Sequence, residues 1–207
     1  MSGAATSTST NTNKNALFFG PQGVGKGTQA TIVAPRLRLA HVSTGDLFRR
    51  NIAEQTALGQ QVAPILDAGL LVPDTLTIAM LDDHLITLRQ AAPELRGVIF
   101  DGFPRTVAQV ESLDAFLRSR GEQVDAVVYI DAPRPVLVER IFSRGRADDT
   151  REAAEERLRL YEEKTQPLLS LFERRGIIHR INGNQPIEAV TAEIIAALAP
   201  IFEGSTA

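Results

Sequence analysis

One stretch near the N-terminus limits the possible folds of this chain more than any other. An apolar run at residues 16–19 precedes a glycine-rich segment that reaches Lys26, and the residues after the lysine favour a helix. Gly20, Gly25 and Lys26 fit the spacing G-x-x-x-x-G-K. Glycines let backbone N–H groups turn inward around an anion, while the helix N-terminus and the lysine add positive charge. The stretch predicts a buried strand, a loop that binds nucleotide phosphates, and a helix.

One position departs from the usual form of this loop. The residue after the lysine is commonly Ser or Thr, whose hydroxyl binds Mg²⁺, but here it is Gly27, and the hydroxyl comes one residue later at Thr28. We therefore expect phosphates and water to hold the metal, and the sequence leaves open whether Thr28 contacts it. The alternative interpretation is a glycine-rich turn that merely connects a strand to a helix.

Composition narrows the class of protein further. The chain has 207 residues, of which 43% are hydrophobic, which suits one compact domain over residues 16–202. A net charge of −3 gives no reason to expect nucleic-acid binding, and no segment approaches the roughly 18 apolar residues of a membrane span. The absence of cysteine excludes thiolate zinc sites and is compatible with the cytoplasm, where we expect the protein. Residues 1–15 and 203–207 are predicted to be disordered tails.

Alternating strand and helix patterns predict an α/β fold with a parallel sheet. Continuous apolar runs at residues 98–100, 127–130 and 177–181, and a shorter one at 41–42, are typical of strands covered on both faces. Helical spacing predicts helices over residues 151–174 and 186–198, and residues 41–96 contain much helix and little strand. Because ligands bind beyond the carboxyl ends of such strands, we expect the phosphate loop, Asp101 and Asp131 to face one crevice.

The segment after the second long strand, residues 101–106, has the composition of a second ligand-binding loop. Asp101 is placed to orient Mg²⁺-bound water, and Gly102 permits close approach of a ligand. Arg105 is predicted to open a helix that also carries Gln109 on the same face. The arginine offers a bidentate contact to phosphate, and the glutamine amide can bind a base edge. A solvated helix start is the alternative.

Two other groups of charged residues are ambiguous. Asp46 and Arg49 are spaced either for a local ion pair or for an anion clamp. Among the arginines of residues 140–159, Arg144 and Arg146 flank a glycine in a short loop, which suggests charge stabilisation during phosphoryl transfer. The three histidines, at 41, 84 and 179, show no metal-ligand spacing and are interpreted as structural or surface residues.

Four motifs in fixed order give the chain a family resemblance. They are Gly23-Val24-Gly25-Lys26-Gly27-Thr28-Gln29, Ser43-Thr44-Gly45-Asp46-Leu47-Phe48-Arg49, Asp101-Gly102-Phe103-Pro104-Arg105-Thr106 and Gly145-Arg146-Ala147-Asp148-Asp149. Over roughly residues 15–202 the sequence resembles the adenylate kinase family. The resemblance implies a five-stranded parallel sheet, a helical AMP-binding insertion at residues 43–72, and a lid at residues 144–150. It also implies reversible phosphoryl transfer from MgATP to AMP, giving two ADP. We expect a monomer, and no zinc, because the short lid has no Cys or His ligands for zinc.

The resemblance also implies roles for individual residues. ATP would be bound by Gly23, Val24, Gly25, Lys26, Gly27, Thr28, Arg140, Arg144 and the backbone of Gln185. AMP would be bound by Thr44, Arg49, Leu70, Leu71, Val72, Gly102, Phe103, Pro104, Arg105, Gln109, Arg146 and Arg157. The catalytic cations would be Lys26, Arg105, Arg144, Arg146 and Arg157, and Asp101 would hold Mg²⁺ through water.

The lid departs from the commoner bacterial pattern. Only a few residues lie between Arg144 and Asp149, where long-lid members of the family insert a longer segment that sometimes carries zinc. Water exclusion is then expected to rely on a small loop and on closure of the insertion. A UMP/CMP kinase of the same superfamily and a nucleotide-binding module without catalysis stay open as alternatives. Thr106 favours AMP, because UMP/CMP kinases typically carry Asn at that position.

Overall fold

Five parallel strands form the centre of the computed structural model, which describes residues 13–67, 72–143 and 150–202. The strands lie in the order β2-β3-β1-β4-β5 and are β1 (Lys14–Phe19), β2 (Leu39–Ser43), β3 (Gly97–Asp101), β4 (Val124–Asp131) and β5 (Ile178–Asn182). Phe18 of β1 pairs with Asp101 of β3, and Phe19 pairs with Tyr129 of β4. The phosphate loop and the Asp101 loop therefore follow the carboxyl ends of two neighbouring strands, on the same side of the sheet.

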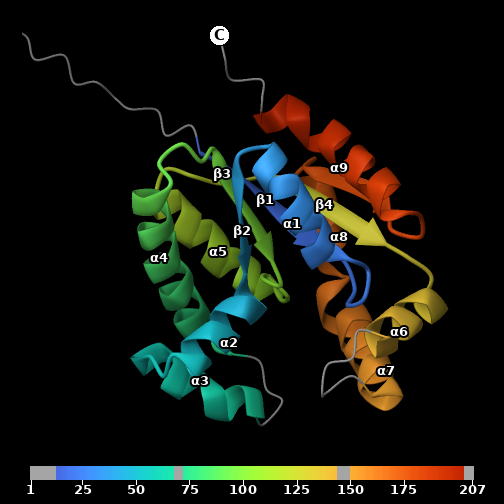
Figure 1. The fold of residues 1–207 in the computed structure, drawn as a ribbon, viewed down its shortest axis with the longest axis horizontal. Coiled ribbons are helices and arrows are strands. Elements are labelled where there is room, and N and C mark those ends of the chain that lie inside the picture. Colours follow the sequence, from blue (N-terminus) through green and yellow to red (C-terminus); the bar gives the residue numbers. More distant parts are fainter. Residues whose placement is uncertain (1–12, 68–71, 144–149, 203–207) are drawn as a thin grey trace, which may run out of the picture.

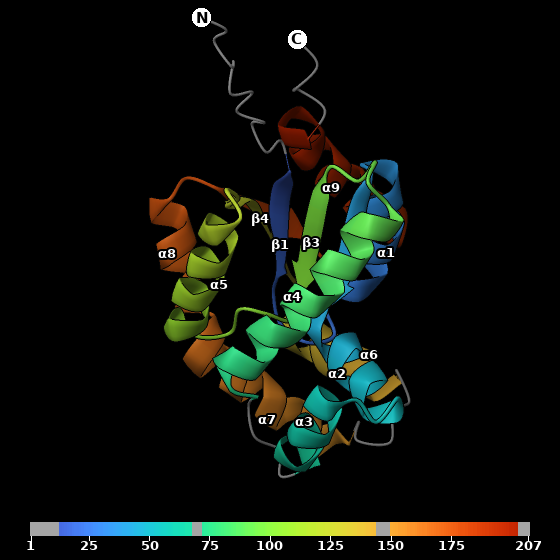
Figure 2. The ribbon, with the colours of Figure 1, turned by 90° about the vertical axis from the view of Figure 1, so that its left-hand side faces the viewer.

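Helices cover both faces of the sheet, so the domain has three layers (Figures 1 and 2). α1 (Lys26–Arg36) and α9 (Ile187–Phe202) lie on one face, and α4 (Asp74–Ala91), α5 (Val107–Ser119) and α8 (Leu168–Arg174) lie on the other. The other helical segments are α2 (Thr44–Ala53), α3 (Ala57–Asp67), α6 (Arg134–Ser143), α7 (Arg151–Leu160) and a π-helical turn, η1 (Tyr161–Thr165). Among the described residues, no helix combines the length and the apolar character needed to cross a bilayer.

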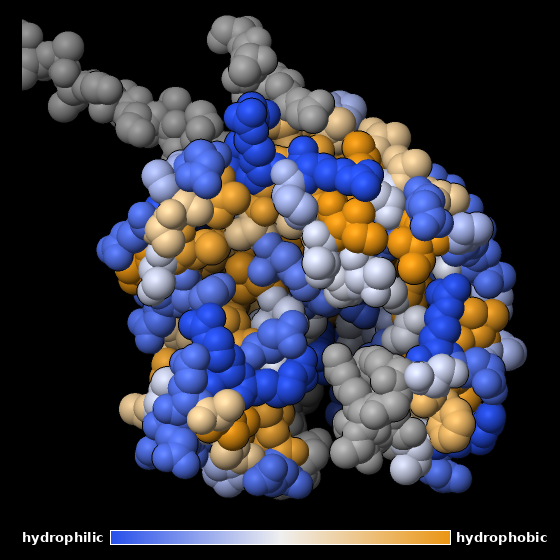
Figure 3. Space-filling view, viewed as in Figure 1, coloured by the Kyte–Doolittle hydropathy of each residue, from blue (hydrophilic) through white to orange (hydrophobic). Residues whose placement is uncertain are grey.

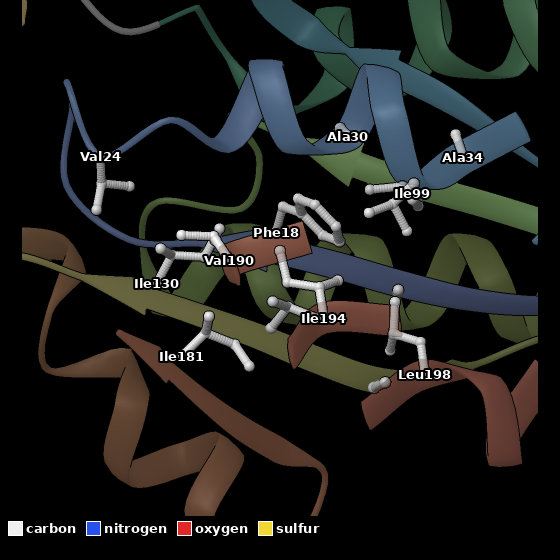
Figure 4. Packing of buried hydrophobic residues seen from close by; sticks show 14 of the residues in the cluster. Phe18, Val24, Ala30, Ala34, Ile99, Ile130, Ile181, Val190, Ile194 and Leu198 are labelled. Carbon is white, nitrogen blue, oxygen red and sulfur yellow. The ribbon is translucent and has the colours of Figure 1, made fainter. Parts of the chain in front are cut away.

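The alternation of side chains along the strands builds two apolar cores. In β1, Ala16 and Phe18 point to the face covered by α1 and α9, whereas Leu17 and Phe19 point to the face covered by α4, α5 and α8. Figure 4 shows the first core, with Phe18 packed among Ile130, Ile194 and other aliphatic side chains of strands and helices. Apolar side chains cover both faces of β1, which explains its continuous apolar sequence.

The predicted helical insertion is a lobe beyond the carboxyl end of β2. Its helices α2 and α3 lie below the sheet in the view of Figure 1. The molecular surface beside these helices is hollowed in Figure 3. Val62 and Val72 pack with Met80 of α4 in a third, smaller apolar cluster. Ser43 caps α2 by accepting the N–H of Asp46, as its sequence position predicts.

Two expected boundaries are corrected by the structure. β1 begins at Lys14, inside the segment that was predicted to be a disordered tail. Hydrogen bonds hold its first two residues in place: Lys14 Nζ donates to the Ile201 carbonyl, and the Asn15 N–H donates to Asp125. The single helix expected over residues 151–174 is divided into α7, η1 and α8. Pro167 has no N–H and would clash with the carbonyl four residues earlier, so a regular helix cannot run through it.

Candidate phosphoryl-transfer site

The predicted phosphate loop connects β1 to α1, and two of its glycines are required for different reasons. Gly20 has φ +142°, and a Cβ atom there would lie 2.2 Å from the Ile130 carbonyl oxygen of β4, so no side chain fits. Gly25, the N-cap of α1, has φ +100° with open space around it, so its backbone conformation alone favours glycine. The turn thus lies tight against the sheet and presents its N–H groups at the start of a helix.

Lys26 lies across this loop. Its Nζ atom donates to the Gly20 carbonyl at 2.7 Å and to the Pro21 carbonyl at 2.9 Å. Val24 anchors the middle of the loop, being 3% exposed within the core of α1 and α9. Thr28, in the first turn of α1, is exposed. The ammonium group is therefore held where phosphates bound by the loop would meet it.

Asp101 faces the start of α1 from the neighbouring strand. Its Oδ2 atom lies 3.6 Å from the position that a Cβ of Gly27 would occupy. The same oxygen lies 3.6 Å from Nε2 of His41 on β2. That buried nitrogen has no hydrogen-bonding partner among the described residues. His41, which was predicted to be a structural or surface residue, reaches the site only because β2 pairs in parallel with β3.

Arg105 is not helical, which corrects the expectation that it opens α5. The helix begins at Val107, and the Thr106 hydroxyl caps it by accepting the Gln109 N–H. Gln109 Oε1 accepts the backbone N–H of Arg105 at 2.8 Å, so the two residues meet through the main chain rather than along one helix face. The spacing Thr-x-x-Gln is close to the capping-box pattern, and that signal was present in the sequence.

The Arg105 side chain folds back over its own loop. Nε donates to the Gly102 carbonyl at 2.7 Å, which leaves the fork of the guanidinium to other partners. Burial lowers the pKa of Arg105, and the negative charge of Asp101 opposes this shift. The group remains a cation at any physiological pH, because the pKa of arginine starts so high.

Residues of the predicted acceptor site lie on the insertion side of this loop. Thr44 is 3% exposed, and its hydroxyl donates to the Asp101 carbonyl at 3.4 Å. Arg49 forms a local ion pair with Asp46, which is one of the two arrangements that their spacing predicted. Both side chains are exposed. Burial would raise the pKa of Asp46, but Arg49 and Ser43 outweigh it and lower that pKa. Val72 is buried in the insertion cluster, while Leu70 and Leu71 lie outside the described residues.

The predicted ATP and lid residues are brought together only in part. Arg140 of α6 donates to the Gly183 carbonyl at 3.0 Å, which joins α6 to the loop after β5. The Gln185 side chain in that loop pairs with Glu193 of α9. Arg157 is half-buried on α7. Arg144 and Arg146 lie outside the described residues, as do residues 144–149 of the predicted lid.

Asp131 follows Ile130, whose carbonyl oxygen faces Gly20 of the phosphate loop. Asp131 lines a cleft of 480 Å³ with Tyr129, Arg180 and Asn182, at the ends of β4 and β5. Among the described residues, no group of three or more His, Asp and Glu side chains could hold a metal ion unaided.

A parallel sheet with a phosphate loop after β1 and an arginine loop after β3 defines a P-loop phosphotransferase. The adenylate kinase family model matches residues 18–177. Adenylate kinases of Deinococcus deserti and Deinococcus radiodurans are 44% and 42% identical to this chain, each over 90% of it and 97% of the relative. That of Kocuria rhizophila is 44% identical over 88% of this chain and 97% of its own length. This chain belongs to the adenylate kinase family.

Proposed function

We propose that this protein transfers the γ-phosphoryl group of MgATP reversibly to AMP, giving two ADP. One observation carries the proposal: the phosphate loop and the Arg105 loop leave adjacent strands in register, with Phe18 paired to Asp101. Two phosphate-binding groups from neighbouring strand ends would hold donor and acceptor side by side. Holding two reactants in line is the main requirement of phosphoryl transfer.

The donor half of the proposed site is built on β1 and α1. Residues 23–28 would hold the ATP phosphates, with Lys26 supplying the cation. Arg140, whose guanidinium donates to the Gly183 carbonyl, would pack on the adenine of ATP. The backbone of Gln185 would also contact ATP.

The acceptor half is built on the insertion and on the Arg105 loop. Thr44, Arg49, residues 70–72 and 102–105, and Gln109 would hold AMP. In this role Gln109 would bind the base with its amide nitrogen and the remaining lone pair of Oε1, since the other lone pair accepts from Arg105. Arg144, Arg146 and Arg157 would gather around the transferred group and stabilise its charge.

Asp101 and His41 fit a site for Mg²⁺ that is held through water. The carboxylate faces the start of α1, and the neighbouring His41 Nε2 is a buried atom that a water molecule would satisfy. Mg²⁺ keeps several waters and is bound by few carboxylates plus phosphates, which this sparse donor set matches. When bound, the ion would neutralise charge on the phosphates.

A panel of acceptors tests the proposal. ADP formation is measured at saturating MgATP with AMP, CMP or UMP varied, and with no acceptor as the control for ATP hydrolysis. We expect kcat/KM for AMP to exceed that for CMP and UMP by roughly 10² or more, because a mismatched base leaves buried polar groups unpaired. Equal use of CMP or UMP would assign the chain to UMP/CMP kinases instead. Nucleotide binding without any ADP formation would leave only a binding module.

We propose further that the enzyme works as a cytoplasmic monomer without zinc or nucleic-acid partners. The net charge of −3 speaks against nucleic-acid partners, and the lack of cysteine speaks against a thiolate zinc site. Light scattering on the purified protein should give a mass near 22.5 kDa, with or without nucleotides. A stable mass of twice that value would contradict the monomer.

A further inference from the structure

The π-helical turn η1 interrupts the helix that begins with α7. Its defining bond runs from the Gln166 N–H to the Tyr161 carbonyl, at 2.8 Å, one residue more than an α-helical bond spans. Such a turn widens the helix just before Pro167, which cannot continue a regular ladder of hydrogen bonds. Single π-turns inside helices are frequent at functional sites.

This turn contacts the last residue of β1 and the Arg105 loop of the proposed site. At its first residue, the Tyr161 ring packs against Phe19, the residue directly before the phosphate loop, with ring centroids 6.1 Å apart. At its last residue, the Thr165 hydroxyl donates to the Arg105 carbonyl at 3.1 Å. The two contacts lie one turn apart on the face of the helix that points to the sheet.

The hydroxyl of Thr165 completes a clamp on the backbone of Arg105. The N–H of that residue is held by Gln109 Oε1 at 2.8 Å, and its carbonyl is held by Thr165. The two side chains come from different helical segments and fix the peptide groups on both sides of one Cα atom. The Thr165 side chain is buried, at 8% exposed, so water cannot readily replace its hydroxyl.

We propose that Thr165 is a positioning residue for the acceptor phosphate, acting through the Arg105 backbone. This inference rests on the proposed function, in which Arg105 binds the phosphate of AMP. Without the hydroxyl, the peptide group after Arg105 loses one of its two anchors. The guanidinium group is then no longer held in the direction of the AMP phosphate. A small misplacement of this kind is costly in phosphoryl transfer, because positioning supplies most of the catalysis.

The informative pair of variants is Thr165→Val, which removes the hydroxyl and keeps the shape, and Thr165→Ser, which keeps the hydroxyl. Thr77→Val is the matched control, because Thr77 is also a buried threonine whose hydroxyl donates to a backbone carbonyl, that of Pro73 on its own helix. We expect Thr165→Val to lower kcat/KM for AMP about tenfold, with KM for ATP within about twofold of wild type. Thr165→Ser should restore most of the loss, and Thr77→Val should cause none.

A double-mutant cycle shows whether the effect passes through Arg105. In the Arg105→Ala background, Thr165→Val should change kcat/KM for AMP by less than about twofold, since no guanidinium remains to be aimed. A full tenfold loss in that background would overturn the proposal. Equal rises in KM for ATP and AMP, or a lower Tm with unchanged kinetics, would also overturn it.

Amide hydrogen exchange separates this inference from the proposed function. Residues 102–107 should exchange faster in Thr165→Val than in wild type, and at the wild-type rate in Thr165→Ser and Thr77→Val. If the wild type failed to use AMP, the proposed function would fall, while faster exchange in Thr165→Val would still support the clamp. Unchanged exchange in Thr165→Val would overturn the clamp whatever the activity.

Discussion

Among single residues, the two cations at the centre of the site are oriented in the same way. Lys26 donates to carbonyls of its own loop, Gly20 and Pro21, and Arg105 donates to the carbonyl of Gly102. A carbonyl dipole fixes the direction of a cation without cancelling its full charge. In the proposed site, both groups would thus be oriented in advance for phosphate oxygens, which is the arrangement that electrostatic catalysis requires.

Lys26→Ala should therefore remove activity and leave the fold intact. We expect kcat to fall by at least about 10², comparable to the loss of one preorganised electrostatic contact. Stability should change little, because Lys26 is the first residue of α1 and its side chain is not part of the apolar cores. Steady-state assays at saturating nucleotides, with circular dichroism to verify folding, provide the measurement. A folded variant that turns over at the wild-type rate would exclude the phosphate-loop assignment.

At the scale of secondary-structure elements, capping decides where α5 begins and so where Arg105 lies. The Thr106 hydroxyl accepts the Gln109 N–H, and the same glutamine reaches back to Arg105. Asn is as good an N-cap as Thr. The Thr106 position, which the family resemblance links to acceptor choice, thus has a structural role that Asn fills equally well.

Thr106→Ala and Thr106→Asn separate these two roles. Loss of the cap in Thr106→Ala should cost about 1 kcal/mol of unfolding free energy, whereas Thr106→Asn should cost little. We expect Thr106→Asn to retain the preference for AMP over CMP and UMP. Urea unfolding and the acceptor panel are the measurements. A switch toward CMP or UMP in Thr106→Asn would show that this side chain selects the base.

The two tyrosines of the chain lie in one cluster between β4 and η1, and both pack on Phe19. Burial, with the charge of Asp131, raises the pKa of Tyr129 from 10.0 to about 12, and burial likewise raises the pKa of Tyr161. The fold therefore stabilises the protonated phenols. Their contribution to stability is complete below pH 10, and for Tyr129 it is lost as the pH rises toward 12.

An ultraviolet titration of tyrosinate tests this dependence. The folded protein should show little ionisation near pH 10, where the urea-unfolded chain titrates, and should ionise together with alkaline unfolding. Tyr129→Phe should make stability decline less between pH 10 and pH 12. Ionisation of both tyrosines near pH 10 in the folded protein would contradict the buried cluster.

At the scale of the whole molecule, a polar network closes the sheet at the end opposite the site. The Glu122 side chain is fully buried, accepts from Asn15 Nδ2 at 3.0 Å, and pairs with Arg89 of α4. It joins β1, α4 and the turn before β4. A buried carboxylate is tolerated because its partners satisfy its oxygens.

Glu122→Ala should destabilise the fold without changing catalysis. Removing the carboxylate leaves the Asn15 amide and the Arg89 guanidinium short of a partner, and we expect a loss of about 2 kcal/mol in unfolding free energy. The kcat of the folded variant should equal that of wild type, because the network lies at the far end of the strands. Unfolding curves and assays well below the Tm measure both quantities. A large fall in kcat with unchanged stability would contradict the separation.

The sequence by itself determined the parallel sheet, the phosphate loop and the loop after β3. Those features depend on local patterns, such as apolar runs and the spacing of Gly20, Gly25 and Lys26, which persist whatever the rest of the chain does. The start of α5 was also encoded locally, in Thr106 and Gln109. The Thr106 hydroxyl caps the helix, so α5 begins at Val107 and Arg105 lies before it.

Tertiary structure alone decided which distant side chains support the site. Thr165 lies 60 positions from Arg105, and Glu122 lies 107 positions from Asn15, so no periodicity in the sequence links them. His41 reaches Asp101 only because β2 pairs with β3. The π-turn places Tyr161 against Phe19 at the end of β1 and Thr165 against the Arg105 loop. Such contacts depend on how packed layers align, and packing is a property of the whole chain rather than of any segment.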